Sequence, residues 1–309
     1  RGIQTSSFDY LSSAAQLYLI YGKNSPYIDR LSWNQLSELN INKLTGDFIK
    51  ATKYEATVHY FGSDDFETSK QRILSSLAFA SGRTEAPEYF VREIQKQTEP
   101  VIYHINKPGT RQSNIFLMLH VVDQYNATLS AETNLFNNYF GSGLTNIFFS
   151  EIREYRSMAY SAGATITKES VAGKPAFMIG RVGTQVDKTN NATEVIFSLL
   201  NNMPLKPTKA QSARNNMVYG APLRRPSDRN LTYYVESWER FGYNDDPSKI
   251  NAEIYANANL ETINAFYKEY IQSKPVSLII VGDRKKIDTK KLGTLGKYEF
   301  VNASKLFSE

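Results

Sequence analysis

Residues 149–168 read FSEIREYRSMAYSAGATITK, and they join the charged end of a helix to a strand. Apolar residues before and within the stretch recur at the spacing of one helix face: Leu144, Ile147, Phe148 and Ile152. Charged residues follow them, and a strand-like run begins near Tyr160. Arg153 and Tyr160 therefore both lie at this junction between helix and strand. The guanidinium of Arg153 offers a rigid fork of hydrogen-bond donors, and the phenol of Tyr160 offers a single donor.

Hydrophobic periodicity on both sides of this junction predicts an α+β fold, with a mainly antiparallel sheet and helices packed on one face. The predicted strands are 101–105, 114–122, 158–167, 175–183 and 276–282, the last of which ends the sheet. The predicted helices are 130–140, 144–154, 191–203, 208–219, 228–242 and 259–272. The run Gly141-Ser142-Gly143 lacks the Lys and the preceding strand of a phosphate loop, so it is interpreted as a helix break.

The two ends of the chain carry a weak internal repeat. NINKLTGDFIKATKYEATVHYFGSD begins at Asn40 and NLETINAFYKEYIQSKPVSLIIVGD at Asn259, and each predicts an amphipathic helix, a strand and then a glycine. Those glycines are 282 − 62 = 220 residues apart, and Tyr21-Gly22 and Phe241-Gly242 share that offset. We therefore expect residues 1–85 to be the back half of a preceding homologous domain, and residues 86–309 to be a complete domain.

A half-domain cannot bury its sheet face alone, so the first segment is expected to pack on the second or on a missing partner. The chain opens with Arg1 rather than Met, which is typical of a mature product or a piece of a longer protein.

Composition excludes several classes of protein. The 309 residues are 41% apolar and 22% charged, as in soluble globular proteins. No run approaches the roughly 18 apolar residues of a membrane span, and the net charge of +5 is too dispersed to predict a nucleic-acid partner. Cysteine is absent, which excludes disulfides and thiolate chemistry. That absence suits an extracytoplasmic bacterial protein, so the periplasm or another extracytoplasmic compartment is the favoured location.

Familiar catalytic centres are missing from the sequence. His59, His104 and His120 lie in predicted strands without a Glu or second His at metal-ligand spacing, so we expect structural or surface histidines. Two interpretations of Arg153 and Tyr160 remain open. Arg153 pairs with a neighbouring Glu while Tyr160 begins a half-buried strand, or the two together hold a peptide carbonyl and stabilise an oxyanion on it.

Residues 140–165, FGSGLTNIFFSEIREYRSMAYSAGAT, resemble the C-terminal-half signature of the pitrilysin/insulin-degrading-enzyme class of zinc metallopeptidases, the inverzincins. That signature is a Gly/Ser-rich stretch followed by L-F-x-E-I-R-E-x-x-x-L-A-Y. The residues in register are Gly141, Gly143, Phe149, Glu151, Arg153, Glu154, Ala159 and Tyr160, whereas Ser157 and Met158 depart from the pattern. Two further segments are similar to the family, NKPGTRQSNIFL (106–117) and VSLIIVGDRKKID with the tail LGTLGKYEFV.

The resemblance implies four homologous α+β domains in two halves around a chamber. It implies that this chain is the C-terminal, substrate-binding half, in which Arg153 and Tyr160 contact the substrate carbonyl and its oxyanion. Zinc belongs to the HxxEH-bearing N-terminal half, on the same or a separate chain, and no zinc ligand carries over to this chain. The expected partners are that half and a peptide substrate, and this chain alone is expected to be inactive.

Two alternatives remain open. Degenerate relatives in the family serve as non-catalytic partners or structural subunits, which would bind a peptide or another subunit without chemistry. The blander alternative is a soluble α+β binding module that keeps the motif only for packing.

Overall fold

The computed structural model describes residues 5–76, 82–88, 90–143, 146–154, 156, 158–220, 223 and 225–308. The chain divides into two compact units. Unit 1 comprises Arg1–Arg30, Arg92–Arg224 and Trp238–Glu309, and unit 2 comprises Leu31–Val91 and Arg225–Ser237. Within the described ranges, no helix combines the length and the hydropathy that a bilayer crossing requires.

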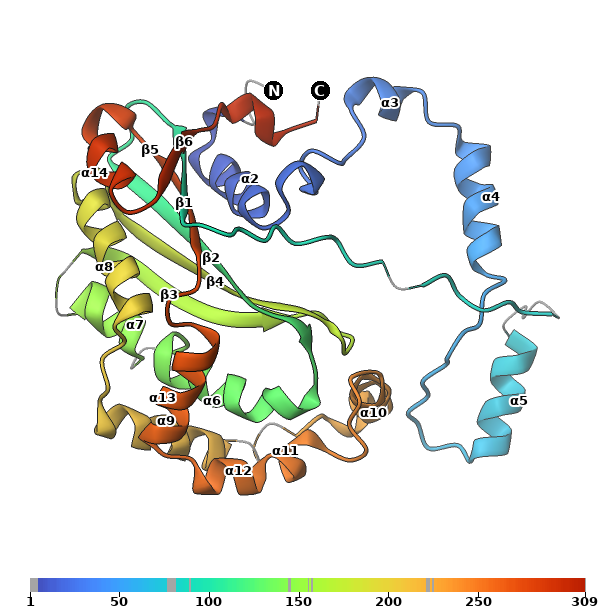
Figure 1. Ribbon diagram of the computed structural model, residues 1–309. Helices are drawn as coiled ribbons and strands as arrows, with labels where there is room; N and C mark the ends of the chain where they lie inside the picture. Colours follow the sequence, from blue (N-terminus) through green and yellow to red (C-terminus); the bar gives the residue numbers. More distant parts are fainter. Residues whose placement is uncertain are drawn as a thin grey trace. The chain divides into compact units, whose positions relative to one another are not determined.

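Unit 1 is built on one six-stranded sheet with the strand order β3-β4-β2-β5-β1-β6 (Figure 1). The strands are β1 (Val101–Asn106), β2 (Gln112–Tyr125), β3 (Ala159–Lys168), β4 (Lys174–Gln185), β5 (Val276–Gly282) and β6 (Lys297–Phe300). The β3–β4, β4–β2 and β2–β5 pairs are antiparallel, whereas β1 runs parallel to both β5 and β6. The predicted α+β class is confirmed, and the sheet is mixed.

Strand β6 was not predicted, so the expectation that residues 276–282 end the sheet is wrong. The four residues KYEF are too short to show an alternating pattern, and their pairing with β1 places them in the sheet.

One face of the sheet is covered by most of the helices of unit 1 (Figure 1). They include α6 (Ser130–Phe140), α8 (Thr189–Asn201), α9 (Pro207–Gly220), α12 (Ala252–Asn257), α13 (Leu260–Tyr270) and α14 (Thr289–Gly293). Because side chains alternate along a strand, Ile115, Leu117 and Leu119 of β2 point into this helical layer. Aromatic side chains pack between these helices; for example, the ring centres of Phe136 and Phe266 are 5.1 Å apart.

The opposite face of the sheet is covered by α2 (Phe8–Tyr21), which the prediction of helices on one face did not include. The helix begins after Ser7, whose hydroxyl accepts from the Tyr10 N–H at 3.3 Å. Its buried Leu11 packs in one cluster with Phe116 and Ile279. The second layer is needed because every residue of β5 is buried, so both faces of the sheet must be shielded from water.

The core of unit 1 also holds a neutral histidine. His104 is fully buried on β1, with Nδ1 2.8 Å from the Tyr298 hydroxyl and Nε2 3.4 Å from the Gly282 carbonyl oxygen. A neutral ring satisfies both contacts by accepting at Nδ1 and donating from Nε2. Burial lowers the pKa of His104 from 6.5 to about 4.

This histidine is expected to make stability depend on pH. Between pH 6.5 and 4 the unfolded chain binds a proton at this histidine and the folded chain does not. The contribution of His104 to the free energy of unfolding is therefore complete above pH 6.5 and is lost as pH falls toward 4. The loss should reach about 3 kcal/mol. The free energy of unfolding in urea should fall less between pH 7 and pH 4.5 for His104→Gln than for wild type. The half-buried His120→Gln is the control, and equal pH dependence in wild type and His104→Gln would contradict the assignment.

Unit 2 holds helices with little buried surface. It contains α3 (Trp33–Ser37), α4 (Ile41–Ala51), α5 (Phe66–Ser76) and most of α10 (Leu231–Arg240). No residue of α4 is buried, and Ile41 and Phe48 on its apolar face are 75% and 70% exposed.

The strand predicted within residues 55–61 is not formed, which corrects the sequence prediction. The residues there adopt no regular secondary structure and are exposed, and an isolated bridge between Tyr54 and Thr84 lies beside them. A strand needs a neighbour for its N–H and C=O groups, and the described residues offer this segment none. His59 in this segment lies 2.8 Å from the Glu236 carboxylate through Nε2.

Candidate functional site

The predicted helix over residues 144–154 is formed from Ile147 onward, and Leu144 lies outside the described residues. Helix α7 (Ile147–Phe149) continues as a π-helical turn over Ser150–Glu154. The Asn146 side chain starts the helix by accepting from the Phe149 N–H at 2.7 Å. Phe148 and Ile152 are fully buried, which turns the exposed Arg153 outward.

Gly141 brings the end of α6 against β3 and so fixes the start of the junction. α6 ends at Phe140, and the predicted helix break at Gly141 is confirmed. The Gly141 carbonyl accepts from the Ala164 N–H at 3.2 Å. A Cβ at residue 141 would lie 1.9 Å from the Ala164 carbonyl oxygen, so only glycine fits this approach.

Asn137 covers the neighbouring part of the outer edge of β3. Its side chain accepts from the Ile166 N–H at 2.7 Å and donates to the Ile166 carbonyl at 3.0 Å. Both groups would otherwise face outward from this edge strand, so α6 closes this part of the edge.

Tyr160 is the extra residue of a β-bulge. Ala159 pairs with Thr184 and Ser161 pairs with Gly183, so two steps along β3 match one step along β4. Such a bulge changes the direction of a side chain relative to a regular strand. Tyr160 is 83% exposed, which excludes the half-buried strand position that one interpretation of the sequence gave it.

Arg153 lies beside Tyr160, with its guanidinium carbon 5.8 Å from the centre of that ring and 5.0 Å from the Phe149 ring. Contacts of this kind hold a guanidinium over aromatic faces. Among the described residues Arg153 makes no ion pair, so the interpretation that it pairs with Glu151 or Glu154 is wrong. The structure thus brings together the two residues predicted to form the site, at one exposed position.

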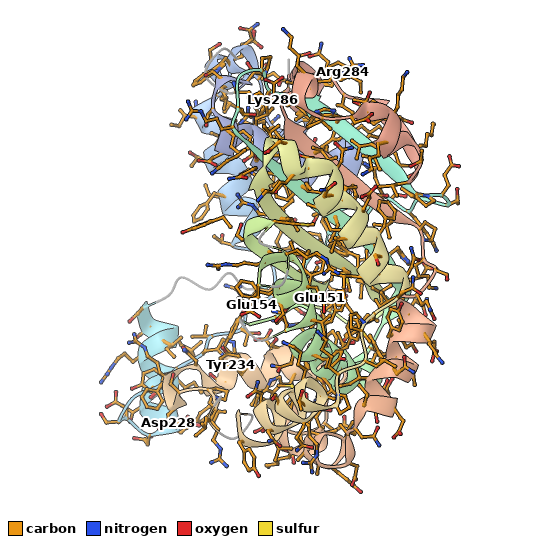
Figure 2. The ribbon with its side chains drawn as sticks, turned by 90° about the vertical axis from the view of Figure 1, so that its left-hand side faces the viewer. Glu151, Glu154, Asp228, Tyr234, Arg284 and Lys286 are labelled. Carbon is orange, nitrogen blue, oxygen red and sulfur yellow. The ribbon has the colours of Figure 1, made fainter. Side chains whose placement is uncertain are left out.

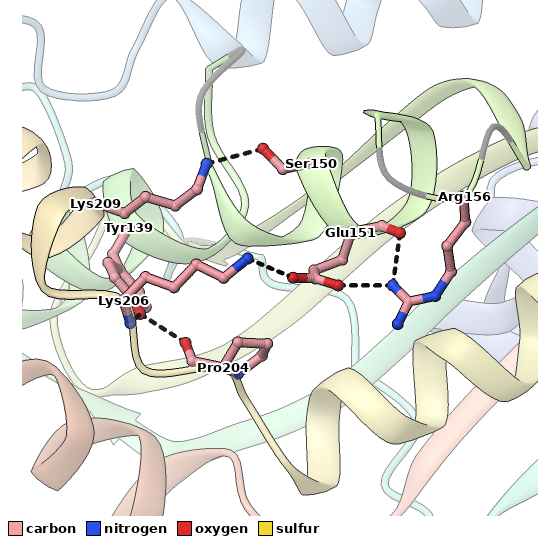
Figure 3. A network of polar contacts seen from close by, with 7 residues as sticks. All are labelled: Tyr139, Ser150, Glu151, Arg156, Pro204, Lys206 and Lys209. Atoms are coloured by element: carbon pink, nitrogen blue, oxygen red, sulfur yellow. Dashed lines mark hydrogen bonds and ion pairs between the residues drawn. The ribbon is translucent and has the colours of Figure 1, made fainter.

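Glu151 ties the turn to the rest of unit 1 (Figure 3). Glu151 is 8% exposed, and its carboxylate accepts from Lys206 Nζ at 2.7 Å and Arg156 Nη1 at 2.7 Å. Arg156 also donates to the Glu151 carbonyl at 2.8 Å. Burial raises the pKa of Glu151, but hydrogen bonds from Lys206 and Arg156 outweigh it and hold the pKa below its ordinary value of 4.5.

Tyr139 fixes the loop from which Lys206 reaches this carboxylate. Its hydroxyl donates to the Pro204 carbonyl at 2.7 Å and accepts from the Lys206 N–H at 2.8 Å. Lys209 donates to the Ser150 hydroxyl at 2.9 Å from the following helix. The sequence did not identify Glu151 as a positioning residue, because Lys206 lies more than fifty positions away along the chain.

Glu151→Gln is expected to lower the free energy of unfolding by about 1–2 kcal/mol at pH 7, because two cations lose their partner while staying partly hydrated. A carboxylate with a lowered pKa stabilises the fold above its unfolded pKa, and this contribution disappears as pH falls through the folded pKa. The wild-type and variant stabilities should therefore converge as pH falls below 4.5. The control is Glu154→Gln on the same turn (Figure 2), expected within about 0.5 kcal/mol of wild type. A difference in stability that did not narrow as pH fell would contradict this role.

The three histidines contact different groups. His59 contacts Glu236, His104 is enclosed in the core, and His120 lies 3.1 Å from Asp123. In the part of the chain that the structure describes, no three side chains of His, Cys, Asp or Glu gather as a metal site would require. These residues do not fit the zinc ion that the family resemblance implies.

The chain matches one family model and is similar to several solved structures. The family model described as the peptidase M16 inactive domain matches residues 63–214. No curated protein sequence matches the chain significantly. A peptidase M16 inactive domain from Pseudomonas fluorescens is 16% identical with a TM-score of 0.66, over 91% of this chain and 67% of that chain.

Two larger proteases share the fold. The ferredoxin protease FusC, solved as a point mutant in complex with Arabidopsis ferredoxin, is 12% identical with a TM-score of 0.68, over 90% of this chain and 30% of that chain. The periplasmic protease PqqL from Escherichia coli is 14% identical with a TM-score of 0.51, over 72% of this chain and 25% of that chain. This chain therefore spans less than a third of either protease.

The family match covers the junction that carries Arg153 and Tyr160, and the fold agrees with it over nine-tenths of the chain. Residues 63–214 therefore belong to the peptidase M16 (pitrilysin) family as a domain of its inactive, C-terminal type, and the chain has the fold of such a domain.

Proposed function

We propose that this chain is the C-terminal, substrate-binding half of a zinc metallopeptidase, which hydrolyses peptides in a chamber formed with a zinc-bearing N-terminal half on the same or a separate chain. The observation that carries the proposal is the placement of Arg153 against Tyr160, with both side chains exposed. The role proposed for this chain is to bind and orient the peptide through these two side chains.

The chemistry of the pair suits a peptide carbonyl. Its oxygen gains negative charge when water adds to the carbon, and donors already aimed at that oxygen stabilise the charge. The Arg153 guanidinium stays charged and offers several N–H donors, and the Tyr160 hydroxyl offers one O–H. The bulge at Tyr160 and the ion pairs of Glu151 hold the two donors in place. These side chains therefore need little rearrangement when the reaction occurs.

The proposal assigns residues 1–85 to the back half of a preceding homologous domain and residues 86–309 to a complete one. Two matched features support it. Helices α4 and α13 are both eleven residues long, and each is capped by an asparagine side chain, from Asn40 and Asn259. Gly22 and Gly242 each follow a helix end with a positive φ, of 56° and 89°.

The exposure of the two copies supports the same assignment. The segment 56–62 is exposed throughout, whereas β5, its counterpart in the repeat, is buried at every residue. The exposed apolar face of α4 is what a half-domain leaves uncovered when its own sheet is incomplete.

Peptide binding by this chain tests the proposal. The ¹⁵N-labelled chain would be titrated with an unfolded twelve-residue peptide with blocked ends, and the amide signal of Tyr160 and its neighbours should shift saturably. Arg153→Ala and Tyr160→Phe should each weaken binding by about three- to ten-fold, because each removes one hydrogen bond to the peptide. Arg284→Ala, on the turn after β5 (Figure 2), should not change it. Unaltered affinity in both site variants would overturn the proposal.

A further inference from the structure

A hollow of about 420 Å³ in the sheet surface lies beside Tyr160. Gln112 and Asn114 of β2, Tyr160 and Ser161 of β3, and Arg181 of β4 are among the residues that line it. Arg181 and Lys188 are its charged lining residues, and no Asp or Glu of the described chain lines it. The hollow therefore favours an anionic group.

Two glycines keep this surface open. Gly163 lies directly opposite Arg181 in the β3–β4 pairing, and it places no side chain against the guanidinium. Gly183 lies between Ser161 and Asn114, where a Cβ would come 2.9 Å from the Ser161 hydroxyl and 3.5 Å from Asn114 Oδ1. A side chain at either position would occupy space beside Arg181.

Arg181 is oriented by buried groups beneath it. Its Nη2 donates to Asn114 Oδ1 at 3.2 Å, and Asn114 Nδ2 in turn donates to the Ser12 hydroxyl of α2 at 2.9 Å. Asn114 and Ser12 are each 3% exposed, so this pair of contacts is enclosed. The guanidinium carbon also lies 5.7 Å from the centre of the buried Phe116 ring.

Arg181 has donors to spare. Across the described ranges its guanidinium makes no ion pair, and Asn114 is the one hydrogen-bond partner of that group. Its side chain is exposed, so a ligand can reach the remaining N–H groups. A guanidinium has five N–H donors in a fork that matches the two oxygens of a carboxylate.

We propose that Arg181 is the cation of a carboxylate-binding subsite beside Tyr160, which selects peptides carrying a carboxylate near the bond held at Tyr160. The inference rests on the proposed function, since it assumes that a peptide lies along this surface. Gly163, the partner of Arg181, is three residues beyond Tyr160, or roughly 10 Å along a strand. The carboxylate is therefore expected about three extended residues from that bond, on an acidic side chain or at the peptide terminus.

Matched peptides with a fluorescent label test the subsite by anisotropy. One twelve-residue peptide carries a single internal Glu and an amidated C-terminus, a second carries Gln instead, and a third carries Gln with a free C-terminal carboxylate. Wild type should bind at least one of the two carboxylate peptides about ten-fold tighter than the neutral peptide. Whether the Glu peptide or the free-terminus peptide gains affinity identifies the source of the carboxylate.

Variants at Arg181 separate charge from shape. Arg181→Gln should remove the preference while leaving the affinity for the neutral peptide unchanged. Arg181→Glu should reverse it, so that a peptide with Lys in place of Glu binds tighter. Lys188→Gln is the matched control, and loss of the preference in that variant but not in Arg181→Gln would overturn the assignment to Arg181.

The outcomes for the subsite and for the proposed function are distinguishable. Equal binding of charged and neutral peptides by wild type overturns the subsite and leaves the proposed function standing. Absence of binding to every peptide, with the variants folded by circular dichroism, overturns both.

Discussion

Arg153→Ala and Tyr160→Phe are each expected to lower kcat about 100-fold in the peptidase reconstituted from this chain and its zinc-bearing half. Both remove a donor whose partner becomes fully charged only when water adds to the peptide carbonyl. KM should rise by only about three- to ten-fold, because the neutral carbonyl of the bound substrate gains less from the same contacts than the oxyanion does. Steady-state hydrolysis of a fluorogenic unfolded peptide measures both constants.

The conservative variant sharpens this test. Arg153→Lys keeps the charge but loses the planar fork, so its kcat should lie between those of wild type and Arg153→Ala. Arg284→Ala should match wild type, since the turn after β5 carries no proposed substrate contact. An increase in KM at constant kcat would show that the pair binds substrate and transition state equally, contrary to the proposed role.

Gly141→Ala is expected to lower the free energy of unfolding by about 3 kcal/mol or more. The new Cβ would lie 1.9 Å from the Ala164 carbonyl oxygen, which belongs to a paired strand and cannot move aside cheaply. Urea unfolding at pH 7 measures the loss.

Gly163→Ala is the matched control for this substitution. A Cβ there meets its nearest neighbour, the Gly141 carbonyl oxygen, at 3.7 Å, which is an ordinary contact. The control should lie within about 0.5 kcal/mol of wild type. Equal destabilisation by both substitutions would contradict the close approach of α6 to β3.

The elements of unit 1 whose signal is local could be predicted from the sequence. Helix α6 occupies residues 130–140 as predicted, because its apolar periodicity ends at a glycine that the fold requires. A preceding turn leads into this helix: the Asn126 side chain caps the 3₁₀ turn Ala127–Leu129, and Ser130 is the first residue of α6.

Features that depend on distant partners could not be predicted. The direction of Tyr160 depends on the pairing of Ala159 and Ser161 with residues 183–184, which no local pattern encodes. The segment 55–61 has the composition of a strand, but a strand forms only where a neighbour is present. Resemblance to the family singled out Arg153 and Tyr160, whereas Arg181 became visible only from the sheet register and the hollow beside it.

One mixing experiment tests the central claim most directly. This chain, the HxxEH-bearing half loaded with zinc, and their mixture would each be incubated with the same fluorogenic unfolded peptide. The proposed function predicts cleavage by the mixture at a rate far above the sum of its parts, and none by this chain alone. A mixture that forms a complex but cleaves no faster than the zinc-bearing half would contradict it, and would indicate a non-catalytic partner instead.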